Sequence, residues 1–192
     1  MRITAVRCFP IETNLIVKVE TDEGIYGLGE GSLAAQVPAT VAVIASFAEW
    51  LTGKDPGDIE HLWQGLFRYT RRKEGIVLLA ALSAIDMALW DIKGKALGVP
   101  VYELLGGRVR DKVRVYQNPG GGTPEEMAER AVACIERYGY TALKLGPHPH
   151  GSEKMPWNAV VRGAAARVKA VRDAVGPDID IGLDPHAKIF EP

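Results

Sequence analysis

The sequence predicts an α+β domain over residues 1–110, followed by a parallel βα series over residues 111–192. Two observations lead to this division. Three short apolar stretches near the N-terminus are separated by only a few residues, which favours an antiparallel meander, and three helical patterns follow them. Beyond Asp111, strand and helix patterns alternate, which is typical of parallel strands joined by crossover helices.

The predicted strands of the first domain cover residues 3–9, 14–22 and 25–31. In the second of them, Leu15, Val17 and Val19 fall on one face, because side chains alternate along a strand. We therefore expect a meander whose one apolar face packs against the helices that follow.

Three helices are predicted to complete this domain, over residues 38–51, 55–69 and 76–98. Asp55 is the expected N-cap of the second helix, with Pro56 at its first helical position. The third helix has the strongest pattern, since apolar residues recur at steps of three and four, and Gly98 is placed to end it.

In the second domain, strands are predicted over residues 112–118, 140–146 and 179–186, with helices over 123–139 and 158–176 between them. Thr123 is the expected N-cap of the first of these helices, with Pro124 next and Glu126 in the capping-box position. Three parallel strands do not close a barrel, nor do they readily bury both faces of a sheet. The second domain therefore looks unfinished, and we expect a truncated chain.

Composition and charge exclude several classes of function. Hydrophobic residues make up 47% and charged residues 24%, and the net charge of −1 favours neither nucleic acid nor an anionic membrane as a partner. No apolar run reaches the roughly 18 residues that a membrane span needs. Cys8 and Cys134 lie far apart in sequence, which is typical of reduced thiols in a cytoplasmic protein.

The stretch ALSAIDMALWDIKGKALGVPVYELLGG, residues 81–107, resembles a family signature. Its pattern of acidic residues in a helix, Gly94-Lys95, Pro100-Val101 and Leu104-Leu105-Gly106 is similar to that of the mandelate racemase/muconate lactonizing enzyme family of the enolase superfamily. The resemblance implies that residues 1–110 form the capping domain. Residues 111–192 would then form about three strands of a (β/α)8, TIM-type barrel. Within the signature, Asp86, Asp91 and Lys95 are expected to make structural contacts.

Active sites of such barrels lie at the carboxyl ends of the strands. The resemblance implies that Asp184 is one of three carboxylate ligands of Mg²⁺, with the other two on later strands. In the galactonate dehydratase-like subgroup, a His two residues later serves as an acid, which corresponds to His186. We expect strand alternation to place both side chains on one side of the sheet. Taken alone, Asp-Pro also suits a simple turn.

Lys144 is the second candidate catalytic residue, because a charged side chain within an apolar strand is expected near the end of that strand. Racemases and cycloisomerases of the family carry a Lys-x-Lys pair here, but Ala142 and Gly146 flank the single lysine of this chain. That departure favours the dehydratase subgroup, in which a lone lysine contacts substrate or metal-bound oxygens. The alternative is a lysine whose head group reaches the solvent at the rim.

Several further residues are candidates for substrate contacts. His148 and His150 have a spacing that suits metal binding, but a solvated loop is the alternative that we favour. Tyr116 and Asn118 end a predicted strand, Trp157 follows the long loop after residue 146, and Leu33 and Gln36 belong to a loop expected to roof the barrel.

The resemblance implies Mg²⁺-dependent removal of a proton α to a carboxylate, with loss of water from a sugar acid. The alternatives are a racemase or cycloisomerase of the same superfamily, or an inactive truncated chain. The expected partners are a small-molecule carboxylate and either a homo-oligomer or another chain that completes the barrel.

Overall fold

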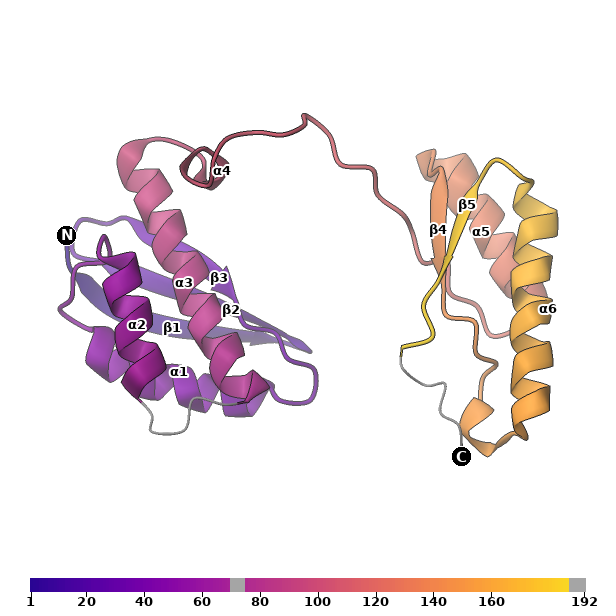
Figure 1. Ribbon diagram of the computed structural model, residues 1–192, viewed down its shortest axis with the longest axis horizontal. Coiled ribbons are helices and arrows are strands. Elements are labelled where there is room, and N and C mark those ends of the chain that lie inside the picture. The colour runs from indigo at the N-terminus through magenta and orange to yellow at the C-terminus, as the bar shows by residue number, and fades with distance from the viewer. Residues whose placement is uncertain (70–74, 187–192) are drawn as a thin grey trace. The chain divides into compact units, whose positions relative to one another are not determined.

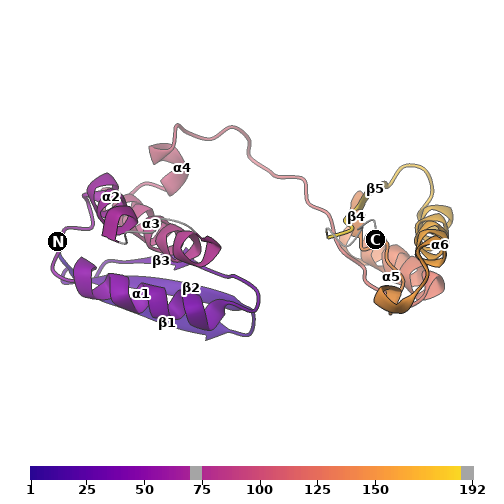
Figure 2. The ribbon, with the colours of Figure 1, turned by 60° about the horizontal axis from the view of Figure 1, so that its bottom comes forward.

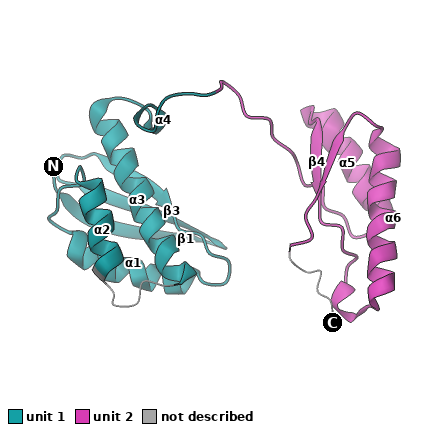
Figure 3. Ribbon diagram, viewed as in Figure 1, with its two compact units in different colours: residues 1–109 teal, residues 110–192 magenta. Residues whose placement is uncertain are grey.

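The computed structural model describes residues 1–69 and 75–186 of the chain. It forms two compact units, residues 1–109 and residues 110–192, coloured separately in Figure 3. The first unit is a three-stranded sheet with helices packed on it, and the second is a parallel βα unit (Figure 1). The architecture is that of an α+β capping domain followed by the opening of a TIM-type barrel.

The sheet of the first unit is the predicted antiparallel meander. It consists of β1 (Ile3–Ile11), β2 (Asn14–Thr21) and β3 (Tyr26–Glu30), in the order β1-β2-β3. Leu15, Val17 and Val19 are completely buried, as their alternation predicts. Their face of the sheet therefore carries the core of this unit.

Three helices share that core: α1 (Val37–Leu51), α2 (Ile59–Tyr69) and α3 (Ile76–Leu97). The apolar stripe of α3 supplies Leu82, Ile85, Leu89 and Ile92, each at most 2% exposed, and α3 lies along β3 in Figure 2. Gly98 ends α3 with a left-handed backbone, φ 70°, as the sequence predicts. A short helix that the sequence did not predict, α4 (Val101–Leu104), follows it.

The start of α2 differs from the prediction. The helix begins at Ile59 and not at Asp55 or Pro56. Asp55 caps a turn instead, because its Oδ1 accepts a hydrogen bond from the backbone N–H of Gly57 at 2.8 Å. The first helical bond in this region runs from Leu62 N–H to the carbonyl of Asp58.

The family signature in α3 holds β3 against the helix. Asp91 accepts a hydrogen bond from the backbone N–H of Leu28 at 2.9 Å and pairs with Lys95 at 2.7 Å. The Lys95 ammonium also donates to the carbonyl of Tyr26. Asp91 and Lys95 therefore make structural contacts, as predicted. Burial, reinforced by the charge of Glu60, raises the pKa of the Asp86 carboxyl.

The second unit contains α5 (Pro124–Tyr138), β4 (Ala142–Leu145), the 3-10 turn η1 (Ser152–Lys154), α6 (Trp157–Val175) and β5 (Asp180–Leu183). β4 and β5 pair in parallel, and α6 connects them. Thr123 caps α5 by accepting from the Glu126 N–H, as predicted, while the Glu126 carboxylate accepts from the N–H of Gly122.

The predicted strand over residues 112–118 is present only as a single parallel bridge from Gln117 to Leu143. Val113, Val115 and Tyr116 are each 59% exposed or more, so this segment buries too little surface to stabilise a ladder. Among the described residues, no helix is long and apolar enough to cross a membrane.

Candidate active site

The candidate site lies at the carboxyl ends of β4 and β5. Leu143 and Leu145 of β4 are buried against α5 and α6, so the intervening Lys144 projects from the opposite face of the sheet. The β5 residue opposite Lys144 is Gly182, and the N–H of Asp184 continues the ladder by donating to the Leu145 carbonyl. The parallel register thus brings Lys144 and Asp184 to the same end of the sheet, as the sequence predicts.

Lys144, Asp184 and His186 meet in one cluster. Lys144 Nζ lies 2.9 Å from Asp184 Oδ2, and His186 Nε2 lies 3.3 Å from the same oxygen. The backbone N–H of His186 donates to Asp184 Oδ1 at 3.1 Å. Asp184 therefore touches both predicted catalytic side chains, and all three groups remain accessible to a substrate, with 20%, 37% and 62% of the Lys144, Asp184 and His186 side chains exposed.

His186 reaches this cluster by a route other than the predicted one. The strand ends at Leu183, and His186 has a left-handed backbone with φ 50°. Strand alternation therefore does not orient it. A turn stabilised by the Asp184 carboxylate folds the chain back and brings the imidazole to the aspartate.

Each charge of the pair stabilises the other. The hydrogen bond from Lys144, followed by the one from the His186 backbone, lowers the pKa of Asp184 below its ordinary value. The bond to Asp184 raises the pKa of Lys144, and Tyr116 adds a smaller effect in the same direction. Near neutral pH the pair is therefore an ammonium and a carboxylate, and Lys144 is a cationic donor. A lysine that acts as a base needs a lowered pKa.

The described residues do not by themselves make a magnesium site. Mg²⁺ takes oxygen ligands in octahedral geometry, usually from more than one group. Asp184 offers one carboxylate, and among residues 1–69 and 75–186 no group of three or more His, Cys, Asp or Glu side chains is arranged to hold a metal. A magnesium site that includes Asp184 requires ligands beyond this set.

The other candidate substrate residues of the second unit occupy different places. Tyr116 lies close enough to Lys144 to affect its pKa. Asn118 borders a hollow of about 450 Å³ between residues 118–121 and 146–153. Trp157, by contrast, lines an apolar groove on the side of the sheet that faces the helices, away from Lys144. Leu33 and Gln36 belong to the first unit, and their roofing role stays a prediction.

Sequence reasoning missed one feature beside this site, and a second, His148, was expected only in a solvated loop. Arg167 of α6 is only 4% exposed, and its guanidinium donates to the carbonyls of Gly121 and Gly122, which holds the loop before α5 against α6. Because Arg167 lies within an amphipathic helix pattern, the sequence did not indicate that it would bind the loop before α5. His148 lines the same hollow as Asn118, and its Nε2 is buried without a hydrogen-bond partner among the described residues.

Comparisons with known proteins agree with this architecture. The family model of the mandelate racemase/muconate lactonizing enzyme N-terminal domain matches residues 3–106, and the enolase C-terminal domain-like model matches residues 126–190. The D-galactonate dehydratase of Variovorax paradoxus is 42% identical over the whole chain, which covers 50% of that enzyme. The chain thus spans about half the length of the curated relatives it matches.

Solved structures show the same partial coverage. An enolase from Agrobacterium radiobacter with bound Na and L-malate matches 100% of the chain over 50% of its own length, with 34% identity and a TM-score of 0.87. An enolase from Pantoea ananatis with bound D-gluconate and Mg matches 98% of the chain over 54% of its own, with 30% identity and a TM-score of 0.85. The chain belongs to the mandelate racemase/muconate lactonizing enzyme family.

Proposed function

We propose that this chain supplies part of the active site of a sugar-acid dehydratase. The observation that carries the proposal is the cluster of Lys144, Asp184 and His186 at the carboxyl ends of two parallel strands. The resemblance to D-galactonate dehydratases, and a relative with bound D-gluconate, support a sugar acid as the substrate.

In the proposed reaction, a base removes the proton α to the carboxylate, and the hydroxyl on the neighbouring carbon leaves. His186 donates a proton to that hydroxyl, which departs as water, and the resulting enol becomes a 2-keto-3-deoxy acid. Lys144, held as a cation by Asp184, stabilises negative charge that develops on the substrate oxygens. The base that takes the α-proton comes from outside the described residues.

Asp184 has a second proposed role as one ligand of a divalent metal, with the remaining ligands from outside the described residues. Its Oδ2 already contacts both Lys144 and His186, so a metal at this oxygen would share it with those groups.

Two alternatives differ from this proposal in a testable way. A racemase or cycloisomerase with two bases is disfavoured, because Ala142 and Gly146 flank Lys144 where a second lysine would stand. An inactive chain is the other alternative. The specific observation in its favour is that the chain spans half the length of its relatives.

A chimera tests the proposal and separates it from both alternatives. Residues 1–192 replace the half of the Variovorax paradoxus enzyme that they match. The chimera is incubated in D₂O with Mg²⁺ and a panel of sugar acids, and the products are read by NMR. We expect 2-keto-3-deoxy acids. Accumulation of the deuterated α-carbon epimer without any 2-keto-3-deoxy acid would indicate racemase chemistry, and a folded chimera without either product would favour the inactive alternative.

A further inference from the structure

Arg167 of α6 carries a charge that is almost completely removed from solvent. The residue is 4% exposed, and its guanidinium donates to the carbonyls of Gly121, at 3.2 Å, and Gly122. Burying a charge costs free energy, and an apolar side chain of similar volume at such a position is often neutral or favourable for stability. The packing of α6 therefore does not account for an arginine here, whereas the two carbonyls that it binds do.

These carbonyls belong to a loop over residues 118–122 that leads into α5. Gly121 has a φ of 121°, which favours glycine, and a Cβ atom there would lie 2.7 Å from the backbone nitrogen of Met127. The loop thus rests directly on the first turns of α5, and the N–H of Gly122 donates to a carboxylate of that helix. These contacts tie the loop to α5, whereas Arg167 ties it to α6.

Asn118, the first residue of this loop, lies next to the candidate active site. The preceding residue, Gln117, bridges to Leu143 in parallel, and its carbonyl accepts from the Lys144 N–H at 2.9 Å. Asn118 therefore comes beside Lys144 in this register, along the edge of β4 opposite to β5. Its side-chain Oδ1 accepts from the N–H of Gly120 at 3.1 Å, which leaves the amide N–H groups of this exposed residue as donors.

We infer that Arg167 is a positioning residue, which holds Asn118 where its amide donates to a hydroxyl of the sugar acid away from the reacting carbons. The inference rests on the proposed function. Asp184 and His186 follow β5 on one side of Lys144, and Asn118 lies on the other side, so a substrate that reacts at the cluster extends toward the loop. Without Arg167 the loop keeps its contacts with α5 but loses its tie to α6, and the amide is less closely confined.

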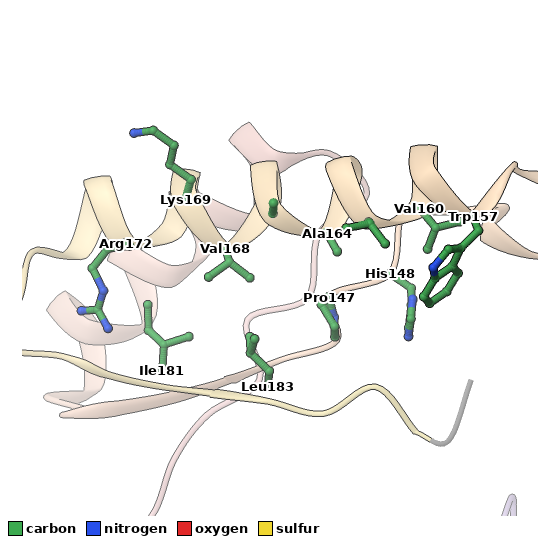
Figure 4. A pocket seen from close by; sticks show the side chains of 12 residues that line it. Pro147, His148, Trp157, Val160, Ala164, Val168, Lys169, Arg172, Ile181 and Leu183 are labelled. Atoms are coloured by element: carbon green, nitrogen blue, oxygen red, sulfur yellow. The ribbon is translucent and has the colours of Figure 1, made fainter. Parts of the chain in front are cut away.

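Arg172 of the same helix provides a matched control. Its Nη1 also donates to two backbone carbonyls, those of Gly176 and Ile179, each at 2.7 Å. These carbonyls precede β5 at its amino end, and Figure 4 shows Arg172 at the opposite end of α6 from Trp157. Arg167→Met and Arg172→Met therefore remove the same type of contact, but only the first contact lies at the carboxyl end of the sheet, where the cluster is.

The variants are made in the chimera with the Variovorax paradoxus half, and circular dichroism establishes that each keeps its helices. Affinity for D-galactonate with Mg²⁺ is measured as KM where the chimera turns over, and by calorimetry where it does not. We expect Arg167→Met to weaken affinity about three- to tenfold, as for the loss of one hydrogen bond, without lowering kcat. Arg172→Met should leave both unchanged. Arg167→Lys, which keeps the charge but not the paired donors, replaces the methionine variant if that variant does not fold.

Asn118→Ala tests whether Arg167 acts through the loop. It should weaken affinity by a similar factor, and adding Arg167→Met should cause no further loss, because both changes remove the same interaction. Additive losses, an equal loss in Arg172→Met, unchanged affinity in Arg167→Met, a lower kcat at unchanged KM, or a wild-type chimera that binds no sugar acid would each overturn the inference. A chimera that binds D-galactonate without dehydrating it contradicts the proposed function only, and the same comparison of affinities still decides the role of Arg167.

Discussion

Lys144 and Asp184 stabilise each other's charged forms at the carboxyl ends of β4 and β5. The pairing stabilises the folded protein at pH values at which Asp184 is a carboxylate and Lys144 is an ammonium. The favourable contribution of Asp184 is therefore lost as the pH falls through its lowered pKa, and that of Lys144 is lost as the pH rises through its raised pKa. Both are present across the neutral range.

The first prediction concerns this pair. Replacing Lys144 by Met should raise the pKa of Asp184 toward the ordinary aspartate value of about 3.9, because the largest cause of its lowering is removed. Carbon-13 NMR of the carboxyl group as a function of pH measures the change. Lys169→Met is the matched control, since Lys169 pairs with Asp173 on α6. An Asp184 titration that is unchanged in Lys144→Met would contradict the assigned pairing.

At the scale of single residues, the sequence predicted the positions of Lys144 and Asp184, but not how His186 and Trp157 are oriented. Alternation along β4 is enough to separate Lys144 from Leu143 and Leu145, and parallel pairing then brings Asp184 beside it. The turn that brings in His186 was not predictable from strand periodicity, because it depends on a left-handed residue beyond the strand. Trp157 lies in the apolar groove because its helix, and not the preceding loop, sets its direction.

At the scale of elements, the helices with local signals were predicted well. Thr123 and Pro124 begin α5, and Gly98 ends α3, because caps act within one turn of the chain. Residues 112–118 have the composition of a strand, but a strand also needs partners that composition does not reveal. Aspartate is common both as an N-cap and in an aspartate turn, so the residue type alone does not distinguish the two. The hydrogen bond that Asp55 accepts from the Gly57 N–H shows that it forms the turn.

The second prediction concerns the contact between β3 and α3. A Cβ atom at Gly29 would overlap the carbonyl of Ala84, and one at Gly27 would overlap that of Ala88, so the strand lies directly on the helix backbone. Gly29→Ala should lower the free energy of unfolding by about 1–3 kcal/mol or more, because backbone atoms must move. Urea denaturation measures this. Leu28→Ala, which shortens an exposed side chain of the same strand, should have a much smaller effect.

The whole molecule has the capping architecture of its family, but the described residues hold only part of a barrel. A barrel places its catalytic groups on several strands, and here two neighbouring strands carry the cluster. The number of βα units in the sequence was enough to predict that these residues form only part of a barrel. Sequence patterns could not predict which face would be left open, because that depends on how α6 packs over β4 and β5.

The third prediction is that the purified chain alone does not dehydrate sugar acids, because the described residues hold no complete set of metal ligands and the proposed base for the α-proton comes from outside them. The measurement is formation of 2-keto-3-deoxy acids from a panel of sugar acids with Mg²⁺. Turnover that Asp184→Asn abolishes would show that the chain assembles a working site by itself. Turnover that persists in Asp184→Asn would indicate a contaminating enzyme.

The most direct test of the central claim is the turnover of D-galactonate by the chimera described above, before and after His186→Asn. If His186 is the acid that protonates the leaving hydroxyl, the substitution should lower kcat by about 10²–10⁴-fold while the fold is retained. Ala166→Asp, which places a charge at an exposed position of α6, should leave kcat of the same chimera unchanged. If the chimera dehydrates D-galactonate equally well with asparagine at position 186, the cluster of Lys144, Asp184 and His186 does not perform the chemistry assigned to it.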